Sequence, residues 1–421
     1  MTEFNRLPQT ETVDVCVVGA GVSGSSFAYR CAEDGASVAV LEEADTPGGC
    51  IKTHRYENGD AAELGARAYY NSYGTMLDLL GSLDAKGAIV PLEKTSFRFY
   101  ADKAVRSILS QLSIVQLAMS LPKLAWVSSS GLSVADYYSK ILGRRNYTGA
   151  FRYAARAVLS QPADAFPAEL LFRKRERDKT QPKSFTLEGG NVSLVEKLLD
   201  HERINLKLKC GVTNIERRGD RFHITQSDGA VIDAAAVALS PPAPIAGQLL
   251  ADAAPDLASL LQTLATSTVE TLHVAVEPGL VDESRRANLI GMDQSFYSAL
   301  FKAGRDRDLY TFHFAQDAGL DREAKHRVAA EALDLPVDAL TIVSERRSVL
   351  PALKASDLPS LDAIRAELEA QSSAKGIFLP CNYMQGLSIE DCCQQSLQEH
   401  RRWARSQEAL TPGEDVITRA A

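Results

Sequence analysis

Two short apolar runs, separated by a segment with helical spacing, stand near the start of the chain. Residues 13–18 and 36–41 are nearly continuous runs of small and branched apolar side chains, a pattern typical of buried strands. Residues 25–33 between them have the pattern of a helix, and Gly35 is placed to end it. The pattern therefore predicts a strand, a helix and a second strand in succession.

The loop between the first strand and the helix is rich in glycine. Its residues are Gly19, Ala20, Gly21, Val22, Ser23 and Gly24. Glu42 stands at the end of the second strand, 18 residues after the last of these glycines. A loop of this kind with an acid at this spacing is the fingerprint of dinucleotide binding. The alternative is a glycine-rich turn that binds nothing, but the context and the acid spacing both favour the nucleotide.

Each residue type in the loop has a physical reason. Gly19 permits the tight turn, Gly21 lets backbone amides approach a diphosphate, and Gly24 lets the helix pack closely on the strand. The start of the helix offers unpaired N–H groups and the positive end of its dipole to phosphate. The Glu42 carboxylate can accept hydrogen bonds from ribose hydroxyls and would repel a 2′-phosphate, which argues against NADP.

Two further glycine motifs follow Glu42. The pair Gly48-Gly49 comes first, with Lys52 shortly behind it, and residues 61–67 (AAELGAR) follow. In these motifs and their order the sequence resembles the flavin-containing amine oxidase superfamily, which includes monoamine oxidases, phytoene desaturases and protoporphyrinogen oxidases. The resemblance implies a bound FAD, with the glycine pair close to the extended cofactor and the second turn against the flavin.

The resemblance continues at residues 184–194, at residues 207–215 and in a closing motif at residues 376–392, where a helix N-terminus would point at the flavin ring. It implies noncovalent FAD, since no cysteine stands in the context of a covalent flavin link. The residues it assigns to the cofactor are Gly19, Gly21, Val22, Ser23, Gly24, Glu42, Glu43, Gly48, Gly49, Lys52, Gly65, Ala66, Arg67, Val212, Asn382, Ser388 and Ile389.

Two cysteines depart from the family pattern. Cys50 follows the glycine pair where many relatives have arginine, and Cys381 replaces a glycine of the closing motif. The turn that contains Cys50 and the Asp-Cys ending of the closing motif look nearer the protoporphyrinogen oxidase branch than the monoamine oxidase branch.

The implied fold class is α/β: a Rossmann-like FAD-binding domain (GR2-type) with a discontinuous α+β substrate domain and a helical cap. The expected domains are residues 1–90, 185–265 and 375–421 for FAD binding, 91–184 for the cap and 266–374 for the substrate. Within the substrate domain, strands are expected at residues 271–276 and 309–314 and a helix near residues 322–333. The basic run at residues 173–177 is expected to be a solvated segment, with steering of an acidic substrate as the alternative.

The most apolar stretch of the cap runs from residue 108 to residue 127. Two glutamines, a proline and a lysine interrupt it, whereas a membrane-spanning helix needs about 20 nearly uninterrupted apolar residues. We therefore expect no membrane span. An apolar helix that lines a substrate cavity is the favoured interpretation, and peripheral docking on a membrane surface is the alternative.

The amino-acid composition excludes several classes of protein and site. The formal net charge is −8, so the chain lacks the basic balance of a nucleic-acid-binding protein. The seven cysteines form no CxxC pair and are odd in number, which indicates reduced thiols and a cytoplasmic protein. The seven histidines show no metal-binding spacing, so no metal site is expected. The expected partner is a small-molecule substrate, and the resemblance also allows a homodimer.

The reaction needs few acids and bases, because a flavin accepts a hydride itself. The protein must hold the reacting C–H group and exclude water. The candidate catalytic residues are Tyr69 and Tyr383, each of which follows a flavin-contacting motif, and His273 as a proton shuttle. A structural role is the alternative for each. Residues 268–274 lack the lysine of many oxidases in the superfamily, and residues 348–351 stand where relatives carry a tryptophan.

Three functional hypotheses follow. The leading one is an FAD-dependent oxidase or dehydrogenase that takes a hydride from a C–N or C–C bond of a small organic molecule, in secondary metabolism, and gives an imine or alkene. The second keeps the flavin and makes the enzyme a desaturase of a tetrapyrrole or an isoprenoid, similar to protoporphyrinogen oxidase. The third is a protein that binds flavin for structure and catalyses nothing.

Overall fold

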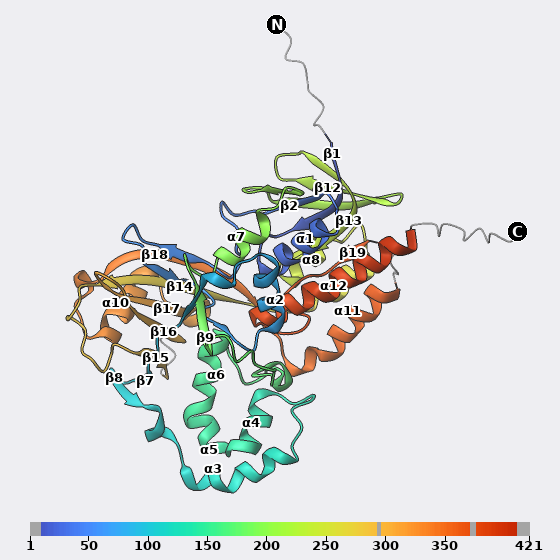
Figure 1. The fold of residues 1–421 in the computed structure, drawn as a ribbon. Coiled ribbons are helices and arrows are strands. Elements are labelled where there is room, and N and C mark those ends of the chain that lie inside the picture. Colours follow the sequence, from blue (N-terminus) through green and yellow to red (C-terminus); the bar gives the residue numbers. More distant parts are fainter. Residues whose placement is uncertain (1–9, 293–295, 371–375, 411–421) are drawn as a thin grey trace, which may run out of the picture.

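The computed structural model describes residues 10–292, 296–370 and 376–410, and Figure 1 shows its three parts. One sheet carries the N-terminal strand and is covered by the long C-terminal helix. A second sheet lies beside it, and a group of short helices projects below both sheets.

The first sheet has the strand order β10-β2-β1-β13-β12-β11, with the short strand β19 paired to β13. Strands β10, β2, β1, β13 and β19 run parallel, and β11 and β12 continue the sheet antiparallel. The bounds are β1 Glu11–Val18, β2 Val38–Leu41, β10 Ile204–Lys207, β11 Val212–Arg218, β12 Arg221–Gln226, β13 Val231–Leu239 and β19 Ile377–Phe378. The two apolar runs near the start of the sequence are thus neighbouring parallel strands, as the Rossmann-like pattern predicts.

Helices bury the apolar side chains of this sheet. The helix α1 (Val22–Glu33) packs against α7 (Ser193–Leu199) and α12 (Ile389–Leu410). The other helices of this part are α2 Gly74–Ser82, α8 Ala243–Leu249, α9 Pro255–Gln262 and α11 Leu358–Ala370. The helix α11 packs on α9, although its residues fall within the range expected for the substrate domain.

The second sheet has the order β18-β14-β17-β16-β15-β7-β8, and α10 (Arg322–Leu333) accompanies it. The strands are β7 Phe97–Ala101, β8 Ala104–Ser107, β14 Thr266–Val276, β15 Asn288–Gly291, β16 Ser298–Ala303, β17 Asp308–Ala315 and β18 Thr341–Pro351. Strands β7 and β8 fall within the range expected for the cap, but they extend this sheet instead. The reason is burial, because β7 pairs with β15 and places Phe99 and Tyr100 in the core.

Small sheets and the cap complete the fold. The hairpin is β3 Thr53–Arg55 with β4 Ala61–Glu63, and a three-stranded sheet is β5 Tyr69–Tyr70, β9 Ser184–Leu187 and β6 Ile89–Pro91. The cap helices are α3 Ile114–Ser120, α4 Val134–Leu142, α5 Arg144–Asn146 and α6 Arg152–Leu159. Among the described helices, none is long and apolar enough to cross a membrane. Several apolar side chains of α3 face solvent, so the expectation that this stretch lines a cavity is wrong for them.

Candidate functional site

The glycine-rich loop joins β1 to α1 with the geometry that its glycines allow. Gly19 takes a φ of +96°, and its N–H donates a hydrogen bond to the carbonyl of Leu41 at 2.8 Å. Gly21 is the residue that caps α1, so the unpaired N–H groups of the first helical turn lie at the loop. A Cβ on Gly24 would lie 2.2 Å from the carbonyl oxygen of Gly19, so the helix can approach the strand only with glycine here.

Glu42 lies directly beside this loop at the end of β2. Its carboxylate accepts hydrogen bonds from the backbone N–H of Ala20 at 2.8 Å and of Ala44 at 3.0 Å. Its carbonyl accepts a hydrogen bond from the N–H of Cys210 at 2.8 Å, which brings the start of β11 at Val212 close to the acid. The structure therefore joins the predicted ribose acid and the predicted adenine-contacting strand.

The glycine pair lies against the same loop. The N–H of Gly48 donates to the carbonyl of Ala20 at 2.8 Å, and a β-bridge joins Gly48 to Gly21. A Cβ on Gly49 would lie 3.0 Å from the Cα of Gly21. Two motifs that are distant in the sequence thus meet through bare backbone, with no side chain between them.

Two cations lie at the glycine pair, and they differ in what they contact. Lys52 folds back onto its own turn, where its Nζ donates to the carbonyls of Thr46 at 2.7 Å and Pro47 at 2.6 Å. Arg346 comes from β18 of the second sheet, and its Nη2 donates to the carbonyl of Gly49. The Nη1 of Arg346 is buried and has no hydrogen-bond partner among the described residues, and burial lowers the pKa of Arg346.

Arg346 provides a positive charge beside Cys50, the position at which many relatives carry arginine. The Cys50 Sγ lies 3.8 Å from the carbonyl oxygen of Val349, so β18 covers the glycine pair. No motif in the sequence marks Arg346 as part of the site, because it reaches Gly49 only through the packing of the two sheets. The one signal was the missing arginine at position 50.

The turn at Gly65 lies next to the glycine pair. A Cβ on Gly65 would lie 2.0 Å from the carbonyl oxygen of Cys50. Glu63, just before this turn, accepts hydrogen bonds from the Thr53 hydroxyl at 2.8 Å and from the N–H of Asn191 at 2.9 Å. Burial raises the pKa of Glu63 to about 7. Two separate segments of the chain, residues 50–53 and the segment at Asn191, thus surround the turn.

Leu64 and Arg67 attach this turn to the second sheet. The hydroxyl of Thr271 in β14 donates to the carbonyl of Leu64 at 3.3 Å. The guanidinium of Arg67 donates to the Asn288 side-chain oxygen at 2.5 Å and to the carbonyl of Phe301 at 3.3 Å. The turn that the resemblance places against the flavin therefore lies at the seam between the two sheets.

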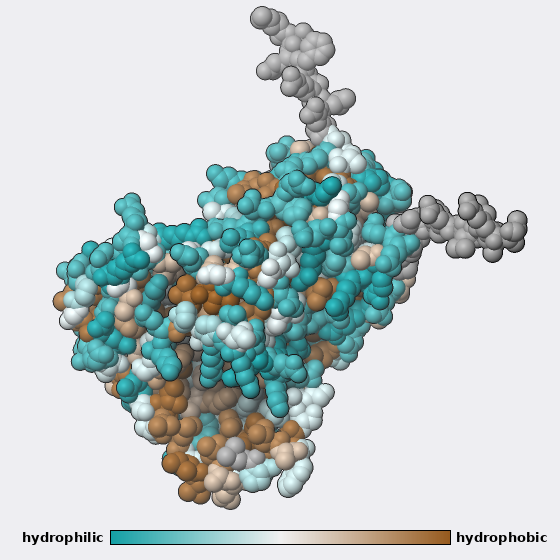
Figure 2. Space-filling model, in the orientation of Figure 1, coloured by the Kyte–Doolittle hydropathy of each residue, from teal (hydrophilic) through white to brown (hydrophobic). Residues whose placement is uncertain are grey.

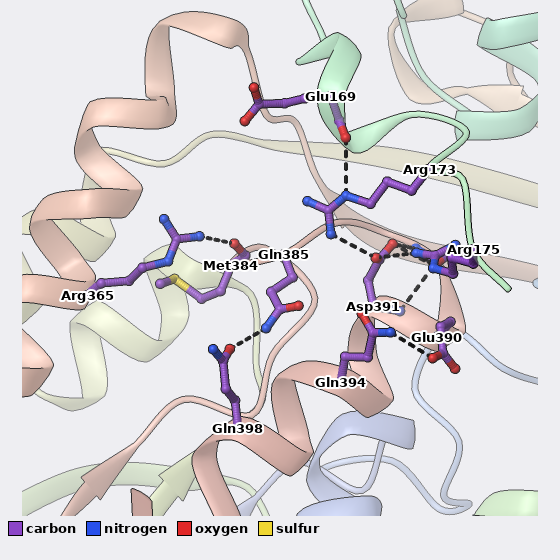
Figure 3. Close-up of polar contacts among 11 residues, drawn as sticks. Glu169, Arg173, Arg175, Arg365, Met384, Gln385, Glu390, Asp391, Gln394 and Gln398 are labelled. Carbon is purple, nitrogen blue, oxygen red and sulfur yellow. Dashed lines mark hydrogen bonds and ion pairs between the residues drawn. The ribbon is translucent and has the colours of Figure 1, made fainter. Parts of the chain in front are cut away.

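The start of α12 carries a buried ion-pair cluster, which Figure 3 shows. The Asp391 carboxylate is 2% exposed and lies 2.6 Å from Arg175 and 3.2 Å from Arg173. The Ser388 hydroxyl accepts a hydrogen bond from the N–H of Asp391 at 3.1 Å and so caps the helix. The expectation that residues 173–177 form a solvated segment is wrong for these two arginines, because a buried carboxylate needs cationic partners.

The first turn of α12 also packs beside the phosphate loop. Ile389 and Val22 belong to one buried apolar cluster, and the Cys392 thiol lies near Ser23. Burial raises the pKa of Cys392 to about 12, so its thiol stays protonated. Asn382 is half-buried in the segment before this helix. The closing motif and the opening motif of the sequence thus meet in the fold.

The three candidate catalytic side chains are fully buried. The Tyr69 hydroxyl donates to the carbonyl of Asn191 at 2.8 Å, and Tyr383 packs in the apolar core. One ring nitrogen of His273 lies 2.7 Å from the Tyr56 hydroxyl, and the other lies 3.1 Å from the carbonyl of Tyr310. These contacts favour the structural alternative for Tyr69 and His273, whereas the buried Tyr383 hydroxyl has no hydrogen-bond partner among the described residues.

Two buried histidines make stability depend on pH. Burial lowers the pKa of His273 and of His313 to about 4, against about 6.5 in an unfolded chain. Between these values the unfolded chain binds protons that the folded chain does not. The free energy of unfolding should therefore fall as the pH drops through this window, by about 1.4 kcal/mol per pH unit for each histidine.

Urea unfolding at several pH values between about 4 and 6.5 tests the prediction. The variant His273→Gln should show a smaller dependence of the free energy of unfolding on pH, because it lacks the contribution of one histidine. An unchanged slope in the His273 variant would contradict the assignment.

These contacts place several turns of the chain next to one another in a row. It runs from Glu42 past Gly21 and Gly49 to the turn at Gly65, and the start of α12 lies beside the same loop. Added Cβ atoms would collide with the backbone at several of its glycines, and the buried Arg346 Nη1 lacks a partner among the described residues. Bare amides, a sugar-binding acid and an unpaired cation are the donor set that an extended dinucleotide such as FAD requires.

Comparisons with known proteins agree with this assembly. Residues 17–83 match the model of an NAD(P)-binding Rossmann-like domain, and residues 130–335 match that of the flavin containing amine oxidoreductases. The flavin-dependent L-tryptophan oxidase RebO of Lentzea aerocolonigenes is 23% identical over 261 residues, which are 51% of this chain and 54% of that protein. A 15-cis-phytoene desaturase of Narcissus pseudonarcissus is 35% identical over 81 residues, which are 19% of this chain and 14% of that protein.

The fold is also shared with solved structures. That of a CLA-producing fatty acid isomerase from P. acnes superposes with a TM-score of 0.74 at 15% identity, over 93% of this chain and 98% of that one. The chain spans about half the length of the tryptophan oxidase and much less of the desaturase. The first match covers the Gly21 loop, the Gly49 pair and the Gly65 turn, and the second, which covers slightly less than half of the chain, includes Thr271 and Asn288 beside that turn. In sequence and fold the chain is therefore similar to the flavin-containing amine oxidoreductases.

Proposed function

We propose that the protein is an oxidoreductase that binds FAD noncovalently and takes a hydride from a C–N or C–C bond of a small organic substrate to give an imine or an alkene. The observation that carries the proposal is the convergence of the Gly21 loop, the Gly49 pair, the Gly65 turn and the start of α12. A flavin is the cofactor that the family implies, and these elements offer it a continuous backbone-lined site.

Different residues of the chain would bind the diphosphate, the ribose and the ring system of FAD. The amides at Gly21 and Gly24, near the start of α1, and that of Gly49 hold the diphosphate, and the Glu42 carboxylate holds the ribose. The turn from Gly65 to Arg67 positions the ring system at the seam between the sheets. Bound FAD would supply the hydride acceptor. Ser388 and Ile389 open α12, whose positive dipole end favours negative charge on a reduced ring.

Few protein acids or bases enter this chemistry. Burial keeps the pKa of His273 and of His313 near 4, so both rings are neutral at neutral pH and neither is a proton donor there. Residues 268–274 also lack the lysine of many oxidases of the superfamily. The proposal therefore leaves bond breaking to the cofactor and gives the protein the tasks of orientation and water exclusion.

A second candidate reaction is desaturation of a C–C bond in an isoprenoid or a tetrapyrrole. The missing lysine favours it over amine oxidation, and the similarity to a phytoene desaturase and the fold shared with a fatty acid isomerase support an apolar substrate. In this second reaction the same flavin site would bind a larger and more apolar substrate.

Anaerobic reduction of the purified protein tests both candidates. We expect a yellow protein that releases its flavin on acid precipitation, because the link is noncovalent. Amino acids, simple amines, porphyrinogens and carotenoid precursors should then be tried for bleaching of the flavin absorbance. Bleaching by an amine or amino acid supports the first candidate, and bleaching by a porphyrinogen or carotenoid precursor supports the second. A colourless protein that does not bind added FAD would contradict the proposal.

A further inference from the structure

A cluster of large apolar side chains lies exposed at the tip of the cap. Figure 2 shows it as a brown area at the bottom of the view, over the part that holds α3 in Figure 1. We call it the cap patch. Its members are 54–84% exposed and are Leu109, Ile114, Val115, Met119, Leu124 and Trp126. Scattered apolar residues are normal on a protein surface, but a contiguous group of this size indicates an interaction site.

The helix α3 is turned opposite to an ordinary surface helix. Its apolar residues Ile114, Val115 and Met119 face outward, whereas its polar residue Gln116 faces the protein. The Gln116 side-chain oxygen accepts hydrogen bonds from the backbone N–H of Arg145 at 2.9 Å and of Asn146 at 3.3 Å. These contacts hold the helix in this orientation. Removing such an outward apolar face from water is favourable, so the face is suited to an apolar partner.

The charged residues near the cap patch indicate what kind of apolar partner fits it. No acidic residue occurs between Asp102 and Asp136, the segment that contains the whole cap patch. Lys123 is exposed within the patch, and Arg144 and Arg145 are exposed at the segment that α3 contacts. The chain as a whole has a net charge of −8, so this local basic character stands against the average. Apolar side chains with basic neighbours and an exposed tryptophan are the composition of a surface that enters the interface of an anionic bilayer.

We propose that the cap patch docks the protein on the surface of an anionic lipid bilayer. The seven-residue helix α3 is too short to cross a bilayer, so it would lie in the interfacial plane with its apolar face in the lipid. A second copy of the chain fits the patch less well. A twofold interface is self-complementary, so it would bring the same basic residues of both copies together. The proposal does not depend on which reaction the protein catalyses.

Co-sedimentation of the full-length flavin-bound protein with vesicles tests the proposal. The vesicles are phosphatidylcholine alone, and phosphatidylcholine mixed with phosphatidylglycerol. We expect sedimentation with the mixed vesicles that weakens with added salt, since exposed charges are screened. Lys123→Glu should weaken binding to the mixed vesicles further.

A triple variant tests whether vesicle binding depends on the cap patch or on exposed apolar residues in general. Val115→Ser, Met119→Ser and Trp126→Ser together should weaken vesicle binding at least about tenfold, because they remove most of the inserted apolar area. The matched control is Ile245→Ser, Leu280→Ser and Val337→Ser, whose side chains are 44–51% exposed and lie outside the cap. This control should bind as the unaltered protein does. Equal flavin content and melting temperature would show that both variants fold.

Three results would overturn the proposal. The first is absence of the unaltered protein from the pellet of mixed vesicles. The second is equal binding by the triple variant. The third is a dimer in sedimentation equilibrium that the triple variant dissociates, because it would identify a second copy as the occupant of the patch.

Discussion

Replacing Asp391 with alanine should lower the free energy of unfolding by about 3–5 kcal/mol, the range for a buried ion pair that loses one partner. Asp391 is 2% exposed, and the change leaves Arg173 and Arg175 without the carboxylate that both contact. The variant also removes negative charge from the first turn of α12, where the helix dipole favours it. Urea unfolding of the purified protein measures the change.

A surface pair is the matched control for this prediction. Asp362 pairs with Arg365 at 2.6 Å, but the Asp362 side chain is 75% exposed, so Asp362→Ala should cost about 1 kcal/mol or less. Adding Arg173→Gln and Arg175→Gln to the Asp391 variant should recover part of the loss, because it removes the unpaired charges. Equal losses for the Asp391 and Asp362 variants would show that the cluster does not stabilise the fold as we infer.

Replacing Arg346 with glutamine should raise the dissociation constant of FAD by about ten- to a hundredfold. A hydrogen bond from a charged group contributes about 1.5–3 kcal/mol, and Arg346 brings an unpaired buried N–H to the glycine pair. Titration of the flavin-free protein with FAD, followed by flavin fluorescence, measures the constant.

The neighbouring Arg347 is the control for Arg346. Arg347 is exposed and donates to the side chain of Gln316 at 3.1 Å, so Arg347→Gln should leave the FAD affinity unchanged. Cys50→Arg in the Arg346→Gln background should restore part of the affinity, because it returns a cation to the position where relatives carry one. If the Arg346 and Arg347 variants bind FAD equally well, the assignment of Arg346 is wrong.

Local patterns predicted the elements that carry the nucleotide site. The apolar runs that became β1 and β2, the glycines between them and Glu42 all act over short distances along the chain, and the structure joins them as expected. The helix expected near residues 322–333 is α10 with the same bounds. The sequence pattern places β7 and β8 in the cap, because β15, the strand that pairs with β7 in the second sheet, lies far away in the sequence. Pairing between distant strands leaves no local signal.

The sequence by itself predicted the Rossmann-like fold and the glycine motifs that require bare backbone, because both depend on the steric demands and hydrophobic spacing of neighbouring residues. The order of these motifs also resembles the flavin-containing amine oxidase superfamily. Only the tertiary structure decided that Arg346 reaches Gly49, that Arg173 and Arg175 turn inward to Asp391, and that the apolar face of α3 points outward. Each of these depends on which segments pack together, and charge or apolarity along the chain does not say toward which side a residue will face.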